Sequence, residues 1–74
     1  MQYYCDDARH LVCWPYSVDN LHKMAADLGV KRCWFHNKEG RYHYDIPKQR
    51  IAEIKAKCRV VTTRQILAII TKQV

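Results

Sequence analysis

Hydrophobic positions recur with a helical period in the segment that follows Ser17. From Val18 onward they fall at i, i+3, i+7 and i+10, which places them on one face of a helix. Ser17 can cap the N-terminus of this helix, and Gly29 can end it because glycine adopts the left-handed conformation at little cost. The pattern predicts an amphipathic helix between Ser17 and Gly29.

Three shorter segments have the character of β-strands. Residues 3–5 are a β-prone run that ends at a pair of aspartates. Residues 31–36 alternate in part between two faces, and residues 42–46 follow a turn at residues 37–40. We expect a strand in each segment, with the last two paired across the turn.

The rest of the chain predicts two more helices around a short strand. Pro47 suits the first turn of a helix that runs to about Cys58, and residues 60–61 form a strand that we expect to be buried. Thr62 and Gln65 then have the spacing of a capping box, which opens a last helix. The predicted order is β-α-β-(β)-α-β-α. The fold is therefore a small three-helix α/β domain with a short, at least partly parallel sheet.

The 74 residues suffice for a single domain, which we take to span residues 1–74. So short a chain buries a limited share of its surface, and a homodimer, a ligand or a metal ion could supplement its stability. Its start lacks the basic and apolar regions of a signal peptide, and no apolar run is long enough to span a bilayer. We therefore expect a cytoplasmic protein without membrane contact, whose four cysteines are thiols.

The charge of the chain is unevenly distributed. Residues 1–30 hold four acidic residues against two Lys and Arg, a net −2, whereas residues 31–74 hold eleven Lys and Arg against three acidic residues, a net +8. A basic half of this kind attracts phosphate groups, whether in a nucleotide, a nucleic acid or an anionic lipid. A soluble basic surface accounts for the same charge equally well.

Polar residues stand where the predicted strands end. They are Asp6 and Asp7 after the first strand, His36 at the end of the second, and Thr62, Thr63 and Arg64 after the last. If the strands are parallel, these residues meet in the crevice where α/β proteins bind ligands. Taken one by one, each also has an ordinary role in a turn or a helix cap. Their coincidence at three strand ends supports a ligand site.

The sequence resembles a family of short bacterial and phage proteins known only as a domain of unknown function. The resemblance covers nearly the whole chain and rests on residues 4–8 (Tyr-Cys-Asp-Asp-Ala), the helix of residues 17–29, Trp34-Phe35, His43-Tyr44-Asp45 and Thr63-Arg64. It implies a stand-alone intracellular domain, in the host cytoplasm if a phage encodes it. It supplies no activity, but it supports these polar positions as functional.

Two metal sites are conceivable. His10 with Cys13 and Cys33 with His36 have a two-residue spacing that zinc ligands use, but such mixed pairs are less specific than Cys-x-x-Cys knuckles, and we do not expect zinc. Alternatively, Mg²⁺ or Mn²⁺ could be held by carboxylates, with a histidine as general acid or base, in a phosphodiesterase or nuclease. The catalytic candidates for this alternative are Asp6, Asp7, Asp45 and His43.

Binding of a phosphate-bearing ligand without catalysis requires the fewest specially placed residues, and it is the leading hypothesis. The amides at the start of the last helix, the arginines and the aromatic residues could bind a nucleotide or a nucleic acid. Asp6, Asp7, Arg9, Trp34, His36, His43, Tyr44, Asp45, Thr62, Thr63 and Arg64 are the ligand-binding candidates, and Arg32 and Arg41 are further cations. Only two glycines are present, which excludes a glycine-rich phosphate loop.

A third hypothesis is a phage protein that inhibits a host protein or sequesters a nucleotide signal. The residues do not rank these two roles. Among the candidates, Thr62 is explained sufficiently as a helix cap. Asp6, Asp7, His43 and Asp45 have no comparable local explanation, so the predicted site narrows to them, with Arg64 as the cationic partner.

Overall fold

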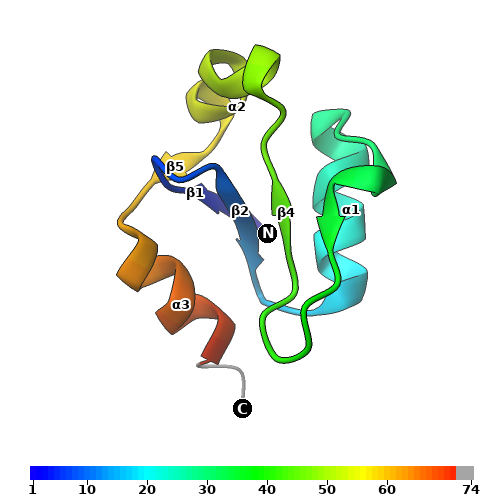
Figure 1. The fold of residues 1–74 in the computed structure, drawn as a ribbon, viewed down its shortest axis with the longest axis vertical. Coiled ribbons are helices and arrows are strands. Elements are labelled where there is room, and N and C mark those ends of the chain that lie inside the picture. Colours follow the sequence, from blue (N-terminus) through cyan, green and yellow to red (C-terminus); the bar gives the residue numbers. More distant parts are fainter. Residues whose placement is uncertain (72–74) are drawn as a thin grey trace.

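A computed structural model describes residues 1–71, which fold into one five-stranded sheet with three helices (Figure 1). The strands are β1 (Gln2–Cys5), β2 (His10–Trp14), β3 (Phe35–His36), β4 (His43–Asp45) and β5 (Arg59–Val60). The helices are α1 (Val18–Leu28), α2 (Ile51–Lys57) and α3 (Thr63–Thr71), with short 3-10 helices at Arg32–Trp34 and Lys48–Arg50. None of the helices within residues 1–71 has the length and apolar character needed to cross a membrane.

The strand order in the sheet is β3-β4-β2-β1-β5. β1 and β5 are parallel, whereas the other three neighbouring pairs are antiparallel. The prediction of a small α/β domain with three helices and a partly parallel sheet is therefore confirmed. Because β1, β4 and β5 all run in the same direction, the residues that follow these three strands lie at the same end of the sheet, beyond the C-terminal ends of these strands.

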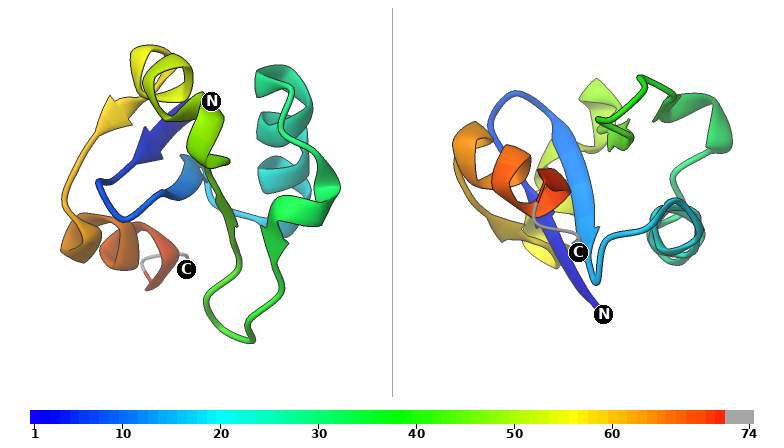
Figure 2. Two further views of the ribbon diagram at one scale, coloured as in Figure 1. Left: turned by 45° about the horizontal axis from the view of Figure 1, so that its top comes forward. Right: turned by 90° about the horizontal axis from the view of Figure 1, so that it is seen from below.

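The two longest helices cover opposite faces of the sheet (Figure 2). In both views α1 lies on one side of β1 and β2, and α3 lies on the other. The core side chains of α1 are Leu21, Met24, Ala25 and Leu28, and those of α3 are Ile66 and Ile70. The sheet thus forms the central layer of three, between α1 and α3.

The two helix predictions that rested on capping residues are confirmed. The Ser17 hydroxyl accepts a hydrogen bond of 3.0 Å from the Asn20 amide, and Gly29 ends α1 with a φ of 71°, in the left-handed region. At the start of α3, the Thr62 hydroxyl accepts from the Gln65 amide, while the Gln65 side chain accepts from the Thr62 amide. This is the reciprocal pairing of a capping box.

Three details of the sequence prediction were wrong. β2 was not predicted, although its side chains alternate between two faces of the sheet. The segment expected as a strand at residues 31–36 is mostly a 3-10 helix, and only its last two residues pair in the sheet. The strand near Val60 exists, but it lies at the edge of the sheet, and Val60 is 49% exposed rather than buried.

Candidate functional site

The register of the central strands brings polar side chains together on the face that α3 covers. His10 on β2 pairs with Asp45 on β4, and His36 on β3 pairs with His43 on β4. Directly paired residues point to the same face, as do residues two apart on one strand. His10, His36, His43 and Asp45 therefore share one face of the sheet.

Asp6 directly follows β1, and its side chain holds His10 of this group by hydrogen bonds. Its carboxylate is 1% exposed and accepts four hydrogen bonds, from the amides of Ala8 and His10 and from the side chains of His10 and Thr63. Burial alone would raise the pKa of Asp6, but the hydrogen bonds from Thr63 and His10 outweigh it and hold the pKa below its ordinary value. Asp6 is thus a charged residue whose acceptor capacity is already in use.

The contact with Asp6 fixes the orientation of His10. Nδ1 of His10 lies 2.8 Å from Oδ2 of Asp6, and a carboxylate can only accept, so Nδ1 carries the proton. The remaining nitrogen, Nε2, is then free to accept. The His10 ring meets the His43 ring edge to face, with centroids 5.0 Å apart and an angle of 84° between the planes. Asp6 therefore positions the histidine that packs against His43.

His43 is nearly buried and is held by the backbone of its own strand. Its Nδ1 lies 2.7 Å from the carbonyl oxygen of Arg41, which can only accept, so Nδ1 again carries the proton. The Tyr16 hydroxyl donates a hydrogen bond of 2.7 Å to the carbonyl of Tyr42 and holds the backbone beside His43. The free nitrogen Nε2 of His43 points toward Asp45.

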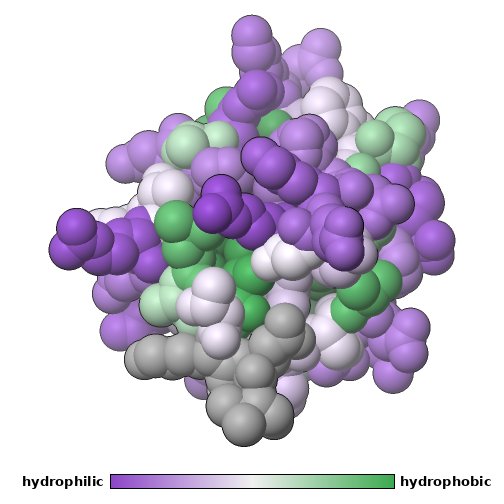
Figure 3. Space-filling model, turned by 60° about the horizontal axis from the view of Figure 1, so that its bottom comes forward, coloured by the Kyte–Doolittle hydropathy of each residue, from purple (hydrophilic) through white to green (hydrophobic). Residues whose placement is uncertain are grey.

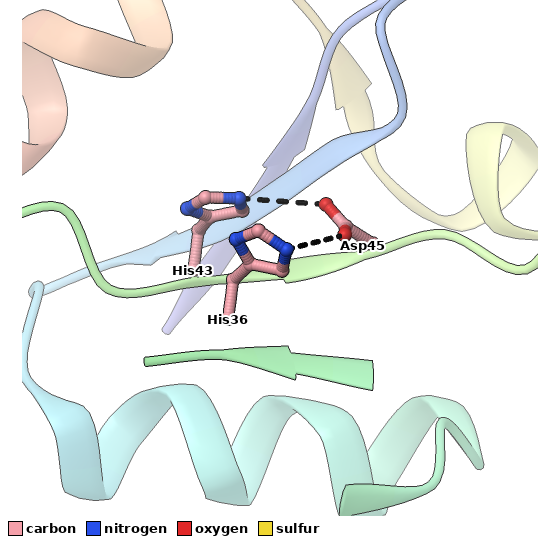
Figure 4. A group of neighbouring side chains, drawn as sticks. All are labelled: His36, His43 and Asp45. Atoms are coloured by element: carbon pink, nitrogen blue, oxygen red, sulfur yellow. Dashed lines mark ion pairs between the residues drawn. The ribbon is translucent and has the colours of Figure 1, made fainter. Parts of the chain in front are cut away.

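Asp45 lies beside the two histidines of the β3–β4 hairpin, and each of them turns a ring nitrogen toward it (Figure 4). Its Oδ1 is 3.4 Å from Nε2 of His43, and its Oδ2 is 3.5 Å from Nε2 of His36. Each of the three residues offers one ligand atom, and these atoms lie within 4.8 Å of one another. Two imidazoles and a carboxylate at this spacing are a ligand set that a transition-metal ion could use.

A cavity of about 450 Å³ opens above this group, between α3 and the β3–β4 hairpin. Its lining includes three basic residues, Arg9, Lys38 and Arg41. The opposite wall is apolar and comes from Ile66, Leu67 and Ile70 of α3. Figure 3 looks at this end of the molecule and shows a mainly hydrophilic surface around smaller hydrophobic areas. The cavity can therefore receive a ligand with an anionic and an apolar part.

Five of the predicted ligand-binding residues line the cavity, and they come from four separate segments of the chain. These residues are Arg9, His36, His43, Asp45 and Thr63. Asp6 lies just beneath them through its bonds to His10 and Thr63. Of the strand-end residues expected to meet, His36 and Thr63 thus line the cavity and Asp6 contacts its lining.

Five other predicted site residues are placed elsewhere. Asp7 is exposed and forms an ion pair of 2.6 Å with Lys55 of α2. Tyr44 is buried on the opposite face, where its hydroxyl contacts His22 of α1 at 2.7 Å. Trp34 lies in a 3-10 helix and does not line the cavity. Thr62 and Arg64 are exposed at the start of α3 and do not line it either.

Neither of the two sets of metal ligands considered from the sequence comes together in the structure. Asp6 and Asp7 point to different surroundings, so the expected carboxylate cluster with Asp45 does not form. Cys13 is buried in the core and Cys33 is exposed, so the pairs with His10 and His36 do not converge on one ion. Among residues 1–71, His36, His43 and Asp45 are the group spaced for a metal. All four cysteines are free thiols, as expected.

Sequence reasoning missed the role of His10 and of Lys38. His10 had been considered as a zinc ligand, and its central position became visible only once β2 was paired with β4. Lys38 had been assigned to a turn, and it is this turn that carries it to the cavity. The short apolar run of residues 11–14, which ends before Pro15, was the signal that could have revealed β2.

The chain belongs to the family described as "Protein of unknown function (DUF4031)", which matches residues 5–73. This confirms the resemblance seen in the sequence. No curated protein and no solved structure matches the chain.

Proposed function

We propose that this domain binds a small phosphate-bearing ligand, such as a nucleotide, in the cavity between α3 and the β3–β4 hairpin. The observation that carries the proposal is the charge of the cavity wall. Arg9, Lys38 and Arg41 line it, and none of the three forms an ion pair with another residue of the described segment, residues 1–71. Cations left without partners around a concave site favour an anionic ligand.

The acidic groups near the cavity do not cancel this charge. Asp6 is buried and already accepts four hydrogen bonds, so it presents no free oxygen to a ligand. Asp45 is the one carboxylate among the lining residues, and it faces His36 and His43. Three cationic residues therefore stand against one carboxylate in the lining of the cavity.

The size and shape of the cavity support a small molecule. A volume of about 450 Å³ lies within the range of about 300–1,000 Å³ that is common for ligand pockets. The apolar wall from Ile66, Leu67 and Ile70 could contact a sugar or a base. Stacking of a base on Tyr44 or Trp34 is not part of the proposal, because neither side chain lines the cavity.

The test is equilibrium binding of ATP and of inorganic phosphate, measured by titration calorimetry in the presence of a chelator. We expect Arg9→Ala and Arg41→Ala each to weaken ATP binding at least tenfold, since a charge-assisted hydrogen bond contributes about 1.5–3 kcal/mol. Arg64→Ala is the matched control, because it removes the same charge from an exposed position outside the cavity. Equal losses in all three variants would show nonspecific attraction to a basic surface and contradict the proposal.

A further inference from the structure

His36, His43 and Asp45 form a group whose geometry the proposed anion site does not explain. The three side chains come from two paired strands, and their ligand atoms lie within 4.8 Å of one another (Figure 4). Both histidines turn a ring nitrogen toward the same carboxylate. Groups that bind a phosphate would instead point their donors into the cavity.

The protonation state of His43 makes this arrangement unusual. Its Nδ1 must carry a proton, because it contacts the Arg41 carbonyl at 2.7 Å. In the neutral ring, Nε2 is then a bare lone pair, and it faces the Asp45 carboxylate at 3.4 Å. Two acceptors that face each other repel unless a cation or a second proton lies between them. A backbone carbonyl that fixes the other nitrogen is also a common support for metal-binding histidines.

The distances favour a metal ion over a proton. The separations of 3.4 and 3.5 Å exceed the range of about 2.7–3.2 Å for a hydrogen bond between nitrogen and oxygen. Ligand atoms about 2.0–2.2 Å from a tetrahedral zinc ion lie about 3.4 Å from each other. The separations of 3.4 and 3.5 Å run to different oxygens of Asp45, and the three ligand atoms lie within 4.8 Å of one another, so small side-chain movements would bring them around one ion.

We propose that His36, His43 and Asp45 bind a divalent first-row transition-metal ion, with Zn²⁺ as the best fit. Two imidazoles and one carboxylate suit zinc, whereas Mg²⁺ prefers oxygen ligands alone. Three protein ligands leave one position of a tetrahedron for solvent or an anion. His10 packs against His43 and supports its ring from the side of Asp6. The proposal uses neither the cysteines nor the carboxylate cluster considered from the sequence.

The surroundings set an expectation for affinity. Three cationic residues, Arg9, Lys38 and Arg41, line the same cavity and repel a metal cation. We therefore expect Zn²⁺ to bind more weakly than in a buried structural zinc site. His36 is the most accessible ligand, because its side chain is 58% exposed. Its substitution is therefore expected to leave the fold intact, whereas His43 is nearly buried and its substitution would confound binding with unfolding.

The experiment is a calorimetric titration of the metal-free protein, without a histidine tag, with Zn²⁺ in a phosphate-free buffer. We expect one ion per chain and at least tenfold weaker binding in His36→Gln and in Asp45→Asn. Cys33→Ser is the control, because it removes the exposed thiol and should leave the affinity unchanged. Substitution with Co²⁺ reports the coordination geometry through its visible absorption, which should be that of a tetrahedral site.

Two results would overturn the metal proposal. One is the absence of stoichiometric binding of Zn²⁺ and Co²⁺. The other is binding that His36→Gln and Asp45→Asn leave unchanged, or that Cys33→Ser removes. A His43 ring that NMR shows doubly protonated at neutral pH in the metal-free protein, together with no metal binding, would assign a hydrogen-bonded ion pair instead. Because ATP binding is measured with a chelator and zinc binding without phosphate, either proposal can fail while the other stands.

Discussion

The hydroxyl of Thr63 donates a hydrogen bond of 2.7 Å to Oδ2 of Asp6, and this bond joins the first residue of α3 to the end of β1. The same oxygen contacts Nδ1 of His10 at 2.8 Å. One buried carboxylate thus links the helix that forms the apolar wall of the cavity to the strand that carries His10. The site depends on this connection, because α3 and the sheet form opposite walls.

Loss of the Thr63 hydroxyl should destabilise the domain. Thr63→Val keeps the shape of the side chain but leaves a charged, buried carboxylate with one donor fewer. We expect the free energy of unfolding in urea to fall by about 1–2 kcal/mol. Thr63→Ser retains the hydroxyl and should lose much less. Equal losses in the two variants would assign the effect to side-chain packing and not to the hydrogen bond.

Asp6 should also make the stability depend on pH. The pKa of Asp6 is below its ordinary value in the folded protein, so its contribution is complete above the pKa of the unfolded chain, near pH 4. This contribution is lost as the pH falls through the lower pKa of the folded state. The free energy of unfolding, measured in urea, should therefore differ less between pH 6 and pH 3 in Asp6→Asn than in the wild type. The same difference in both proteins would place the acid sensitivity on other carboxylates.

Local pattern was enough to predict α1 and the start of α3, because both carry capping residues, whereas the helix expected from Pro47 begins only at Ile51, after a 3-10 helix and without a side-chain cap. Ser17 and Gly29 bound α1, and Thr62 with Gln65 opens α3. These interactions join residues close in sequence, so a single chain reveals them without knowledge of the fold. The same holds for the β3–β4 pair, which is joined by a short connection.

The site was harder to predict because its decisive contacts join distant segments. His10 and Asp45 are neighbours only through the pairing of β2 with β4, and no local pattern specifies that register. One error was avoidable. Successive residues of a strand point to opposite faces, so a strand that carries His43 and Asp45 into a site must turn Tyr44 away from it. Asp6 and Asp7 diverge in a similar way, one into the interior and one toward Lys55.

The four thiols should differ sharply in reactivity. Cys33 is exposed, whereas Cys5 and Cys13 are buried and Cys58 is partly so. Burial raises the pKa of Cys13 to about 11, and burial together with the nearby Cys5 raises that of Cys58 to about 12, so neither supplies thiolate near neutral pH. Brief treatment of the native protein with iodoacetamide should add one group, at Cys33, and treatment in urea should add four. Rapid native labelling of Cys13 would contradict the buried position of β2.

Arg50 should stabilise the C-terminal end of α1, although it is distant from this helix in the sequence. Its guanidinium donates hydrogen bonds of 2.6 Å to the Leu28 carbonyl and 2.7 Å to the Gly29 carbonyl, at the end of the helix where carbonyls lack partners. A positive charge there also interacts favourably with the helix dipole. Arg50→Ala should therefore lower the urea midpoint measurably, and Arg50→Lys should recover only part of the loss, since one ammonium cannot reproduce the fork of the guanidinium.

Glu53 provides the control for Arg50, because it forms an ion pair of 2.6 Å with the same guanidinium. Glu53→Gln removes this pair and leaves the bonds to the two carbonyls in place. The pair is exposed to solvent, where such interactions contribute little. The variant should therefore unfold close to the wild-type midpoint. If Glu53→Gln and Arg50→Ala lowered the midpoint equally, the contribution of Arg50 would come from orientation by Glu53 and not from capping of α1 alone.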